Sequence, residues 1–299
     1  METLPQVLLF GVLRSGLYAL TSLGLAISLG VIGVVNFAHG EFVMLGAYLA
    51  FWLYLALATA TGLGPLVSPL VILAGIPLTG LVLFVLGGGL FRLAVRPVLN
   101  QPELNQMLLT FGISIFLQNL VLIVIGGQAL DANLNWRFEL LDLGPLSVTY
   151  SRLAAFAVSI GLVVAAFLLL TRTRIGKQMR AVAQNRLGAL VVGIPVDRVY
   201  LLAFGLSAAL AGAAGTMLIF QTQVSPFLGL RFILKAFSIV VLAGLGNLWA
   251  VVWASILLGL AEQATAQYVP SGAALAEGLF FVLIFLTLLV RPAGLGRSR

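Results

Sequence analysis

Residues 17–35 read LYALTSLGLAISLGVIGVV, and they are followed by NFAHGE (36–41) and FVMLGAYLAFWLYLALA (42–58). The first and third stretches are continuous apolar runs, and a helix that spans a bilayer needs about 20 such residues. Between them lie Asn36, His39, the only histidine in the chain, and Glu41. Such groups are costly inside a membrane and therefore mark candidate functional sites. The pattern predicts two membrane helices joined by a polar break.

The composition extends this prediction to the whole chain of 299 residues, of which 61% are hydrophobic and 8% charged, with a mean hydropathy of +1.15. Soluble proteins carry roughly 25% charged residues. The apolar runs are continuous, whereas the strands of a membrane β-barrel alternate. We expect an all-α, polytopic membrane protein with a single transmembrane domain over 1–299. The expected spans are 8–33, 40–60, 66–91, 105–126, 147–171, 199–220, 232–245, 249–268 and 273–291; the seventh is short, which leaves eight or nine crossings.

The net charge of +7 comes from basic residues in the loops between spans, a pattern that indicates membrane topology and not nucleic-acid binding. Positive loops face the cytoplasm, which predicts a cytoplasmic location for Arg92, Arg96, Arg172, Arg174, Lys177, Arg180, Arg186, Arg198, Arg291, Arg297 and Arg299. The loop 127–146 is mostly acidic and should face outward. Nine spans would place the N-terminus outside and the C-terminus in the cytoplasm, whereas eight would put both ends on one side.

The first helix lacks a preceding basic region of the kind that signal peptides have, so we expect it in the mature fold.

The segment 172–198 is too polar to span and too long for a turn. Apolar residues recur every three to four positions from Gly176 to Val192, which predicts one amphipathic helix that ends at Gly193 and Pro195. This helix could lie in the lipid interface or dock its apolar face into a groove on a soluble partner. An ordered loop anchored by positive charge is the simpler alternative.

Two interpretations of the Asn36–Glu41 stretch remain open. A helix break permitted by Gly40 would expose backbone groups, and Asn36 and His39 would line a solute path or its gate. Alternatively, the stretch is a cytoplasmic turn in which Asn36 caps the next helix and Glu41 complements its dipole.

Glu262 and Glu277 fall within apolar sequence near the outer ends of two spans, where we expect both carboxylates to be buried, and Arg14 is expected at a comparable depth. We expect Arg14 to neutralise at least one of the two, as a structural clamp or as part of a polar pathway. Arg231 and Lys235 are placed outside, where they would receive a binding protein or a substrate carboxylate, or extend to the interface.

Small residues also recur at four-residue spacing, which favours close helix packing; these are Ser207, Ala208, Ala211, Gly212 and Gly215.

The sequence contains no catalytic or metal-binding pattern. It has no cysteine, its one histidine has no second histidine to share a zinc ion, and no Gly-x-Ser-x-Gly occurs. We therefore expect neither an enzyme nor a metal site.

Several motifs, read in order, resemble one family. They are Asn36–Glu41 with Met44–Tyr48, Arg180–Arg186 with Gly193-Ile194 and Asp197-Arg198, Ser225–Gly229, Lys235–Phe237, Gly244–Asn247 and Gly259–Glu262. Together they resemble the permeases of branched-chain amino acid ABC transporters, and the length is similar to the shorter of their two permease subunits. Urea and short-amide permeases carry very similar motifs, and a passive small-solute channel is the alternative from another class.

The resemblance implies an importer subunit of the bacterial-type plasma (inner) membrane. Its partners would be a second permease, two ATP-binding subunits and an external solute-binding protein, in addition to the lipid bilayer. The chain has no phosphate-binding loop, so ATP and magnesium are expected on the partner ATPases and no cofactor on this chain. The segment 172–198 would be the ATPase-coupling segment, with Lys177, Arg180, Asn185, Arg186, Gly193, Asp197 and Arg198. The position Arg186-Leu187-Gly188 lacks the acidic residue that such segments often carry, so the resemblance implies docking by shape.

Overall fold

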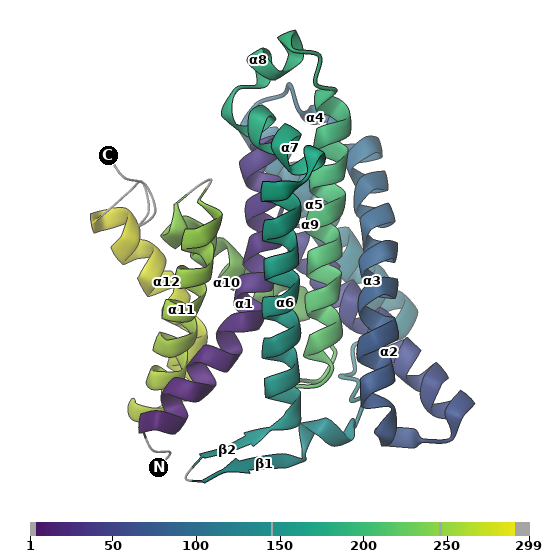
Figure 1. Cartoon of the computed structure of the whole chain (residues 1–299), viewed down its shortest axis with the longest axis vertical. Helices are drawn as coiled ribbons and strands as arrows, with labels where there is room; N and C mark the ends of the chain where they lie inside the picture. Colours follow the sequence, from purple (N-terminus) through teal and green to yellow (C-terminus); the bar gives the residue numbers. More distant parts are fainter. Residues whose placement is uncertain (1–3, 145, 245–246, 291–299) are drawn as a thin grey trace.

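The computed structural model describes residues 4–144, 146–244 and 247–290. Each predicted span corresponds to a helix in a bundle of roughly aligned helices (Figure 1). These helices are α1 (Leu4–Ile32), α2 (His39–Thr61), α3 (Ser68–Leu90), α5 (Glu103–Ile125), α6 (Tyr150–Arg172), α9 (Val196–Leu218), α10 (Leu228–Ala243), α11 (Leu248–Tyr268) and α12 (Gly272–Val290). Among the described residues, 7 helices are long and apolar enough to cross a membrane, the third of them continuing to Val98. The exceptions are α10, with 16 residues, and α12, whose apolar stretch is Ala274–Thr287.

The connections contain several short elements. These are η1 (Gly64–Val67), the π-helical turn η2 (Phe91–Val95), α4 (Arg96–Val98), η3 (Asn135–Arg137), the strands β1 (Leu140–Leu143) and β2 (Leu146–Thr149), α7 (Arg174–Gln184) and α8 (Arg186–Val191). The strands form an antiparallel hairpin in which Leu140 pairs with Thr149. Gly144 turns the chain at a φ of +68°, a conformation that favours glycine. The prediction of an all-helical chain missed this hairpin, because four-residue strands leave almost no periodicity to detect.

The predicted amphipathic helix 176–192 is wrong in one respect, because two helices occupy that segment. Asn185 is extended, with φ −154° and ψ 99°, and it interrupts the helix. Its side-chain oxygen accepts a hydrogen bond from the N–H of Gly188 at 2.9 Å, so it caps α8. Gly193, with a φ of +78°, ends this second helix as predicted.

The two ends of the bundle differ in character. The hairpin lies at one end and α7 and α8 lie at the other (Figure 1). The start of α1 belongs to the hairpin end, because Gln6 Nε2 donates to the carbonyl oxygen of Ser147 at 3.1 Å. Residues 291–299, which carry the predicted C-terminal positive charges, lie outside the described residues.

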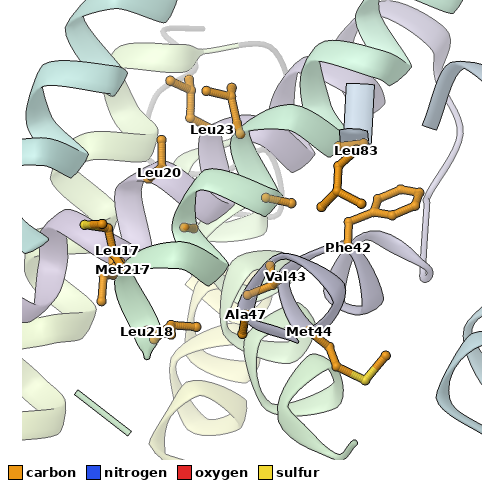
Figure 2. Packing of buried hydrophobic residues seen from close by; sticks show 14 of the residues in the cluster. Leu17, Leu20, Leu23, Phe42, Val43, Met44, Ala47, Leu83, Met217 and Leu218 are labelled. Carbon is orange, nitrogen blue, oxygen red and sulfur yellow. The ribbon is translucent and has the colours of Figure 1, made fainter. Parts of the chain in front are cut away.

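The core lies where α1, α2, α3 and α9 meet. Figure 2 shows the packing of its apolar side chains, including Leu20, Phe42, Leu83 and Met217, which are 0% exposed. Lipid tails are as apolar as these side chains, so close packing and not burial from water holds such helices together. The close approach of α2 and α9 follows this rule, because a Cβ atom at Gly46 would lie 2.5 Å from the Gly212 carbonyl oxygen. The predicted role of the small residues on α9 is confirmed at Gly212 by this contact.

Two helices begin inside the bundle and not at its surface. Helix α1 ends at Ile32 and is followed by Gly33, whose φ is +82°. Residues 33–38 then return without helix to the depth of Thr21, where α2 starts beside α9. Helix α10 starts beside α2, and its 16 residues rise about 24 Å, less than the roughly 30 Å of a bilayer core. The expected helix break is therefore present. The glycine with the unusual backbone conformation is Gly33, whereas Gly40 is helical.

Candidate functional site

The histidine of the NFAHGE stretch joins three helices. His39 is 0% exposed; its Nε2 lies 2.9 Å from the carbonyl oxygen of Thr21 on α1, and its Nδ1 lies 3.1 Å from Ser207 Oγ on α9. A carbonyl oxygen only accepts hydrogen bonds, so Nε2 carries the hydrogen and Nδ1 accepts from the serine hydroxyl. Both nitrogens of a neutral imidazole are thereby satisfied, and His39 acts as a buried cross-link.

Asn36 lies in the non-helical segment that leads into α2. Its Oδ1 accepts from the N–H of Ala38 at 3.1 Å, and its Nδ2 has no hydrogen-bond partner among the described residues. The residue before the first turn of α2 is Ala38, which makes no side-chain cap. Asn36 therefore does not cap the first turn of α2 as expected; its side chain closes a turn on the N–H of Ala38 just before that helix. Asn36 is only 1% exposed, so it lines no open path in this conformation.

Glu41 lies where α2 and α10 begin side by side. It belongs to the first turn of α2, and its Oε1 accepts from Ser114 Oγ on α5 at 3.0 Å. A Cβ atom at Gly229, the second residue of α10, would lie 2.6 Å from Glu41 Oε2. Helix N-termini carry partial positive charge, so the expected pairing of Glu41 with a helix dipole involves two helices. Its Oε2 has no hydrogen-bond partner among the described residues.

A second buried polar cluster lies nearer the hairpin end. Glu262 on α11, whose side chain is 3% exposed, accepts from Lys235 Nζ on α10 at 2.7 Å and lies 3.5 Å from Arg14 on α1. Its other oxygen accepts from the Tyr18 hydroxyl, and Lys235 also donates to that hydroxyl at 3.1 Å. The expected pairing of Arg14 with a glutamate is confirmed for Glu262. Lys235 does not extend to the interface, because its side chain is only 12% exposed.

Glu277 is not part of this cluster. Its side chain is 63% exposed and lies 3.8 Å from Arg231, which is 68% exposed. The predicted burial of Glu277 is wrong, because the first turns of α12 bury Ala276 and Phe280 instead. A cavity of about 420 Å³ opens between Glu277 and the cluster and is lined by residues of α1, η3, β2, α6, α9, α10, α11 and α12.

The predicted coupling residues all lie at the opposite end of the bundle. Thr173 caps α7 by accepting from the N–H of Gly176 at 3.1 Å, and Arg180 donates to the Leu170 carbonyl oxygen. The guanidinium of Arg186 lies over the ring of Tyr200, 6.0 Å from its centre. Asp197 pairs with Arg96 across α9 and α4. Lys177 and Arg198 are exposed.

Large apolar side chains are strongly exposed at this end. Leu187 is 74% exposed, Val191 87% and Val192 74%. Helix α8 projects beyond the ends of the long helices (Figure 1). Exposed apolar patches of this kind mark contact surfaces for proteins or membranes.

Sequence reasoning missed the partners of these side chains. Thr21 and Ser114 carry no signal of their own, Ser207 was noted only as a small packing residue and Gly229 only as part of a motif, and Tyr18 is one aromatic residue among many. Among the described residues there is no group of three or more His, Cys, Asp or Glu side chains that could hold a metal ion.

A polytopic helical bundle with helices that begin inside it and a projecting amphipathic segment is typical of membrane transport proteins. The chain belongs to the family described as the permease component of the branched-chain amino acid transport system, which matches residues 7–288. The predicted resemblance is thus confirmed, and this is a family of transporter permeases and not of enzymes.

Two of the similar proteins align with nearly the whole chain, and a third aligns with less than half of it. The high-affinity branched-chain amino acid transport system permease protein LivH of Salmonella typhimurium is 33% identical, covering 98% of this chain and 95% of its own. BraD of Pseudomonas aeruginosa, described in the same words, is 32% identical over the same shares. The permease protein LivM of Escherichia coli is 32% identical over only 42% of this chain and 29% of its own. LivH and BraD are thus matched along nearly their whole length. No solved structure matches.

Proposed function

We propose that this chain is one of two membrane subunits of an ATP-driven importer of branched-chain amino acids and forms part of the substrate path by alternating access. The observation that carries the proposal is the match over residues 7–288 to a permease family. The bundle supports it, because two helices begin inside it, as in transporters that bind solutes near the membrane midplane.

The projecting helix α8 supports coupling to ATPase subunits. An apolar helical face that is exposed at one end of a bundle suits insertion into a groove on a soluble protein. Leu187 and Val191 supply such a face, and Asn185 and Gly193 fix where the helix begins and ends. The chain carries no phosphate-binding loop, so we assign ATP and magnesium to two partner subunits.

We further propose that the second permease is a LivM-type subunit and that an external solute-binding protein delivers the amino acid. Such a transporter belongs in the inner membrane, with the hairpin and the N-terminus outside and the C-terminus in the cytoplasm. The chain lacks cysteine, so single cysteines report its topology cleanly. A membrane-impermeant maleimide should label Asp142→Cys on intact spheroplasts and Leu187→Cys only after permeabilisation; the reverse pattern would refute this orientation.

The junction of α2 and α10 suits an inner gate. Glu41 and Asn36 each hold one buried polar atom without a hydrogen-bond partner among the described residues, and such atoms are costly to keep buried. Separation of the two helices would hydrate Glu41 Oε2, which lies against the start of α10, so opening would relieve the cost of keeping that atom buried. We propose that Asn36, His39 and Glu41 act at this gate and that Arg14 and Glu262 lie on the path outside it.

Uptake by the reconstituted complex tests the function. The complex of both permeases, both ATPases and the binding protein should accumulate leucine, isoleucine or valine only with ATP. Accumulation of urea or short amides instead would favour the alternative substrate class. Solute flux through this chain without ATP would support the passive channel and defeat the importer.

A further inference from the structure

The cavity of about 420 Å³ at the hairpin end is rich in positive charge. Among the described residues, five basic side chains line it, namely Arg14, Arg137, Arg152, Arg231 and Lys235, whereas Glu277 is the one acidic residue. Basic residues at this end run against the usual concentration of positive charge in cytoplasmic loops. A volume of this size is within the range of small-molecule sites, about 300–1,000 Å³.

The ion pairs around the cavity leave positive charge uncompensated. Asp131 lies 2.6 Å from Arg137, and Glu277 lies 3.8 Å from Arg231. Arg14 and Lys235, by contrast, share the single carboxylate of Glu262. The inner part of the cavity therefore holds two cations and one anion.

The geometry of this trio leaves donors available. Lys235 is close to Glu262, at 2.7 Å, whereas Arg14 is 3.5 Å away and its side chain is 45% exposed. A guanidinium offers five N–H donors in a planar fork that matches a carboxylate. A second carboxylate beside Arg14 and Lys235 would balance the two cations with two anions.

The walls next to this trio are apolar. Leu17, Leu218, Leu228 and Phe232 line the cavity, and Leu228 connects it to the start of α10, beside Glu41. The cavity therefore combines a cationic corner, an apolar wall and the more distant carboxylate of Glu277. This set of groups complements a carboxylate, an aliphatic side chain and an ammonium group.

We propose that this cavity is a binding site for a small aliphatic amino acid, whose carboxylate is held between Arg14 and Lys235 and whose side chain packs on Leu17 and Phe232. This inference rests on the proposed function and adds the place where the substrate is held after delivery. Glu262 orients both cations and is therefore a positioning residue. It would not contact the substrate carboxylate itself, because two negative charges repel. The tyrosine hydroxyl of Tyr18 fixes Glu262 in that orientation.

The test is binding to the purified complex of both permeases and both ATPases, in nanodiscs and without the binding protein. Leucine should protect the complex against thermal unfolding at millimolar concentration. We expect 4-methylpentanoate, which keeps the carboxylate and the aliphatic chain, to protect as well. The amine 3-methylbutylamine, which lacks the carboxylate, should give no protection; equal protection by the amine would overturn the assignment. Inorganic phosphate is the probe for a general anion site, and protection by phosphate equal to that by leucine would also overturn it.

Substitutions locate the site within the cavity. Arg14→Gln removes the excess charge yet leaves Glu262 paired with Lys235 and Tyr18, so the fold should be retained. It should raise the apparent Kd for leucine about tenfold or more, the scale of a lost hydrogen bond to a charged group. Arg14→Lys should restore part of the affinity. Arg152→Gln is the matched control, because Arg152 lines the same cavity over the ring of Phe10, 4.1 Å from its centre.

An equal loss in Arg14→Gln and Arg152→Gln would indicate a diffuse positive field and contradict a site at Arg14 and Lys235. Unchanged binding in Arg14→Gln, with the variant folded, would contradict it directly. Failure of the proposed function is distinguishable, because it would appear as absent ATP-dependent uptake by the wild-type complex with its binding protein. A complex that transports leucine but binds none in this cavity would refute the inference alone.

Discussion

The carbonyl oxygen of Gly229 lies 2.3 Å from the position that a Cβ atom on Gly40 would occupy. The first turns of α2 and α10 are thus packed backbone to backbone, and neither can move aside without separating the two helices. We expect Gly40→Ala to destabilise the protein by about 1–3 kcal/mol, the usual cost of an added methyl group in a packed core.

Thermal unfolding in detergent, followed by circular dichroism, measures this loss. The matched control is Gly89→Ala on α3, because nothing lies within 4 Å of a Cβ atom there. Alanine at that helical site should be neutral or stabilise by about 0.5–1 kcal/mol. Equal unfolding temperatures for Gly40→Ala and the wild type would contradict the close packing.

The hydrogen bond between His39 and Ser207 predicts energetic coupling between α2 and α9. His39→Ala removes two buried hydrogen bonds and Ser207→Ala removes one, leaving unpaired groups that cost about 1–3 kcal/mol each. The double variant leaves neither partner of their shared bond unpaired. Its loss should fall short of the sum of the single losses by about 0.5–3 kcal/mol.

Denaturant unfolding of the four proteins in the cycle measures the coupling. Thr79→Ala combined with His39→Ala is the control, since Thr79 bonds to Thr216 and not to the histidine. Strict additivity of His39 and Ser207 would mean that the hydrogen bond does not form.

Asp131 predicts a pH response of the loop outside the membrane. Burial alone would raise its pKa, but the Asn133 N–H, the Arg137 guanidinium and the Gln223 amide outweigh it and hold the pKa of Asp131 below its usual value. The charged form is thus favoured in the folded loop. The stability that Asp131 contributes is present above its unfolded pKa of about 3.9 and is lost as the pH falls through its lower, folded pKa.

Hydrogen exchange tests this response at Leu130 and Val224, whose backbones pair through two hydrogen bonds of 2.8 Å. After correction for intrinsic rates, both amides should exchange faster below about pH 4. Asp131→Asn should exchange faster already at pH 7 and lose the pH response. Identical protection in both proteins at pH 7 would exclude a role for the carboxylate.

The sequence predicted the positions of the long helices because continuous hydropathy is a local property. It did not predict that α2 and α10 begin inside the bundle, since hydropathy carries no information on the depth at which a helix starts. Gly40 was assigned the helix break, but its role is close packing on Gly229, which is 189 positions away and has no local signature.

The polar sites were likewise predictable only in part. A carboxylate in apolar sequence signals that it needs a partner, so the pairing of Glu262 with a cation was predictable. That Lys235 would be its nearest cation was not, because the position of Lys235 depends on how α10 packs against α1, α2, α11 and α12. Glu277 was predicted to be buried because it lies in apolar sequence. That prediction failed because sequence alone does not determine which face of α12 packs inward.

The exposed apolar residues of α8 predict a loss of coupling without a loss of fold. Val191→Asp places a charge on a side chain that is 87% exposed, and such surface changes usually alter stability by less than about 0.5 kcal/mol. If α8 occupies a groove on the ATPase, a buried unpaired carboxylate there should cost several kcal/mol of binding. We expect the variant permease to be made and inserted normally but recovered with at least tenfold less ATPase. Gln184→Asp, at an exposed polar site at the end of α7, adds the same charge and should keep its ATPase. Co-purification of both variants with equal amounts of ATPase would show that α8 is not the contact.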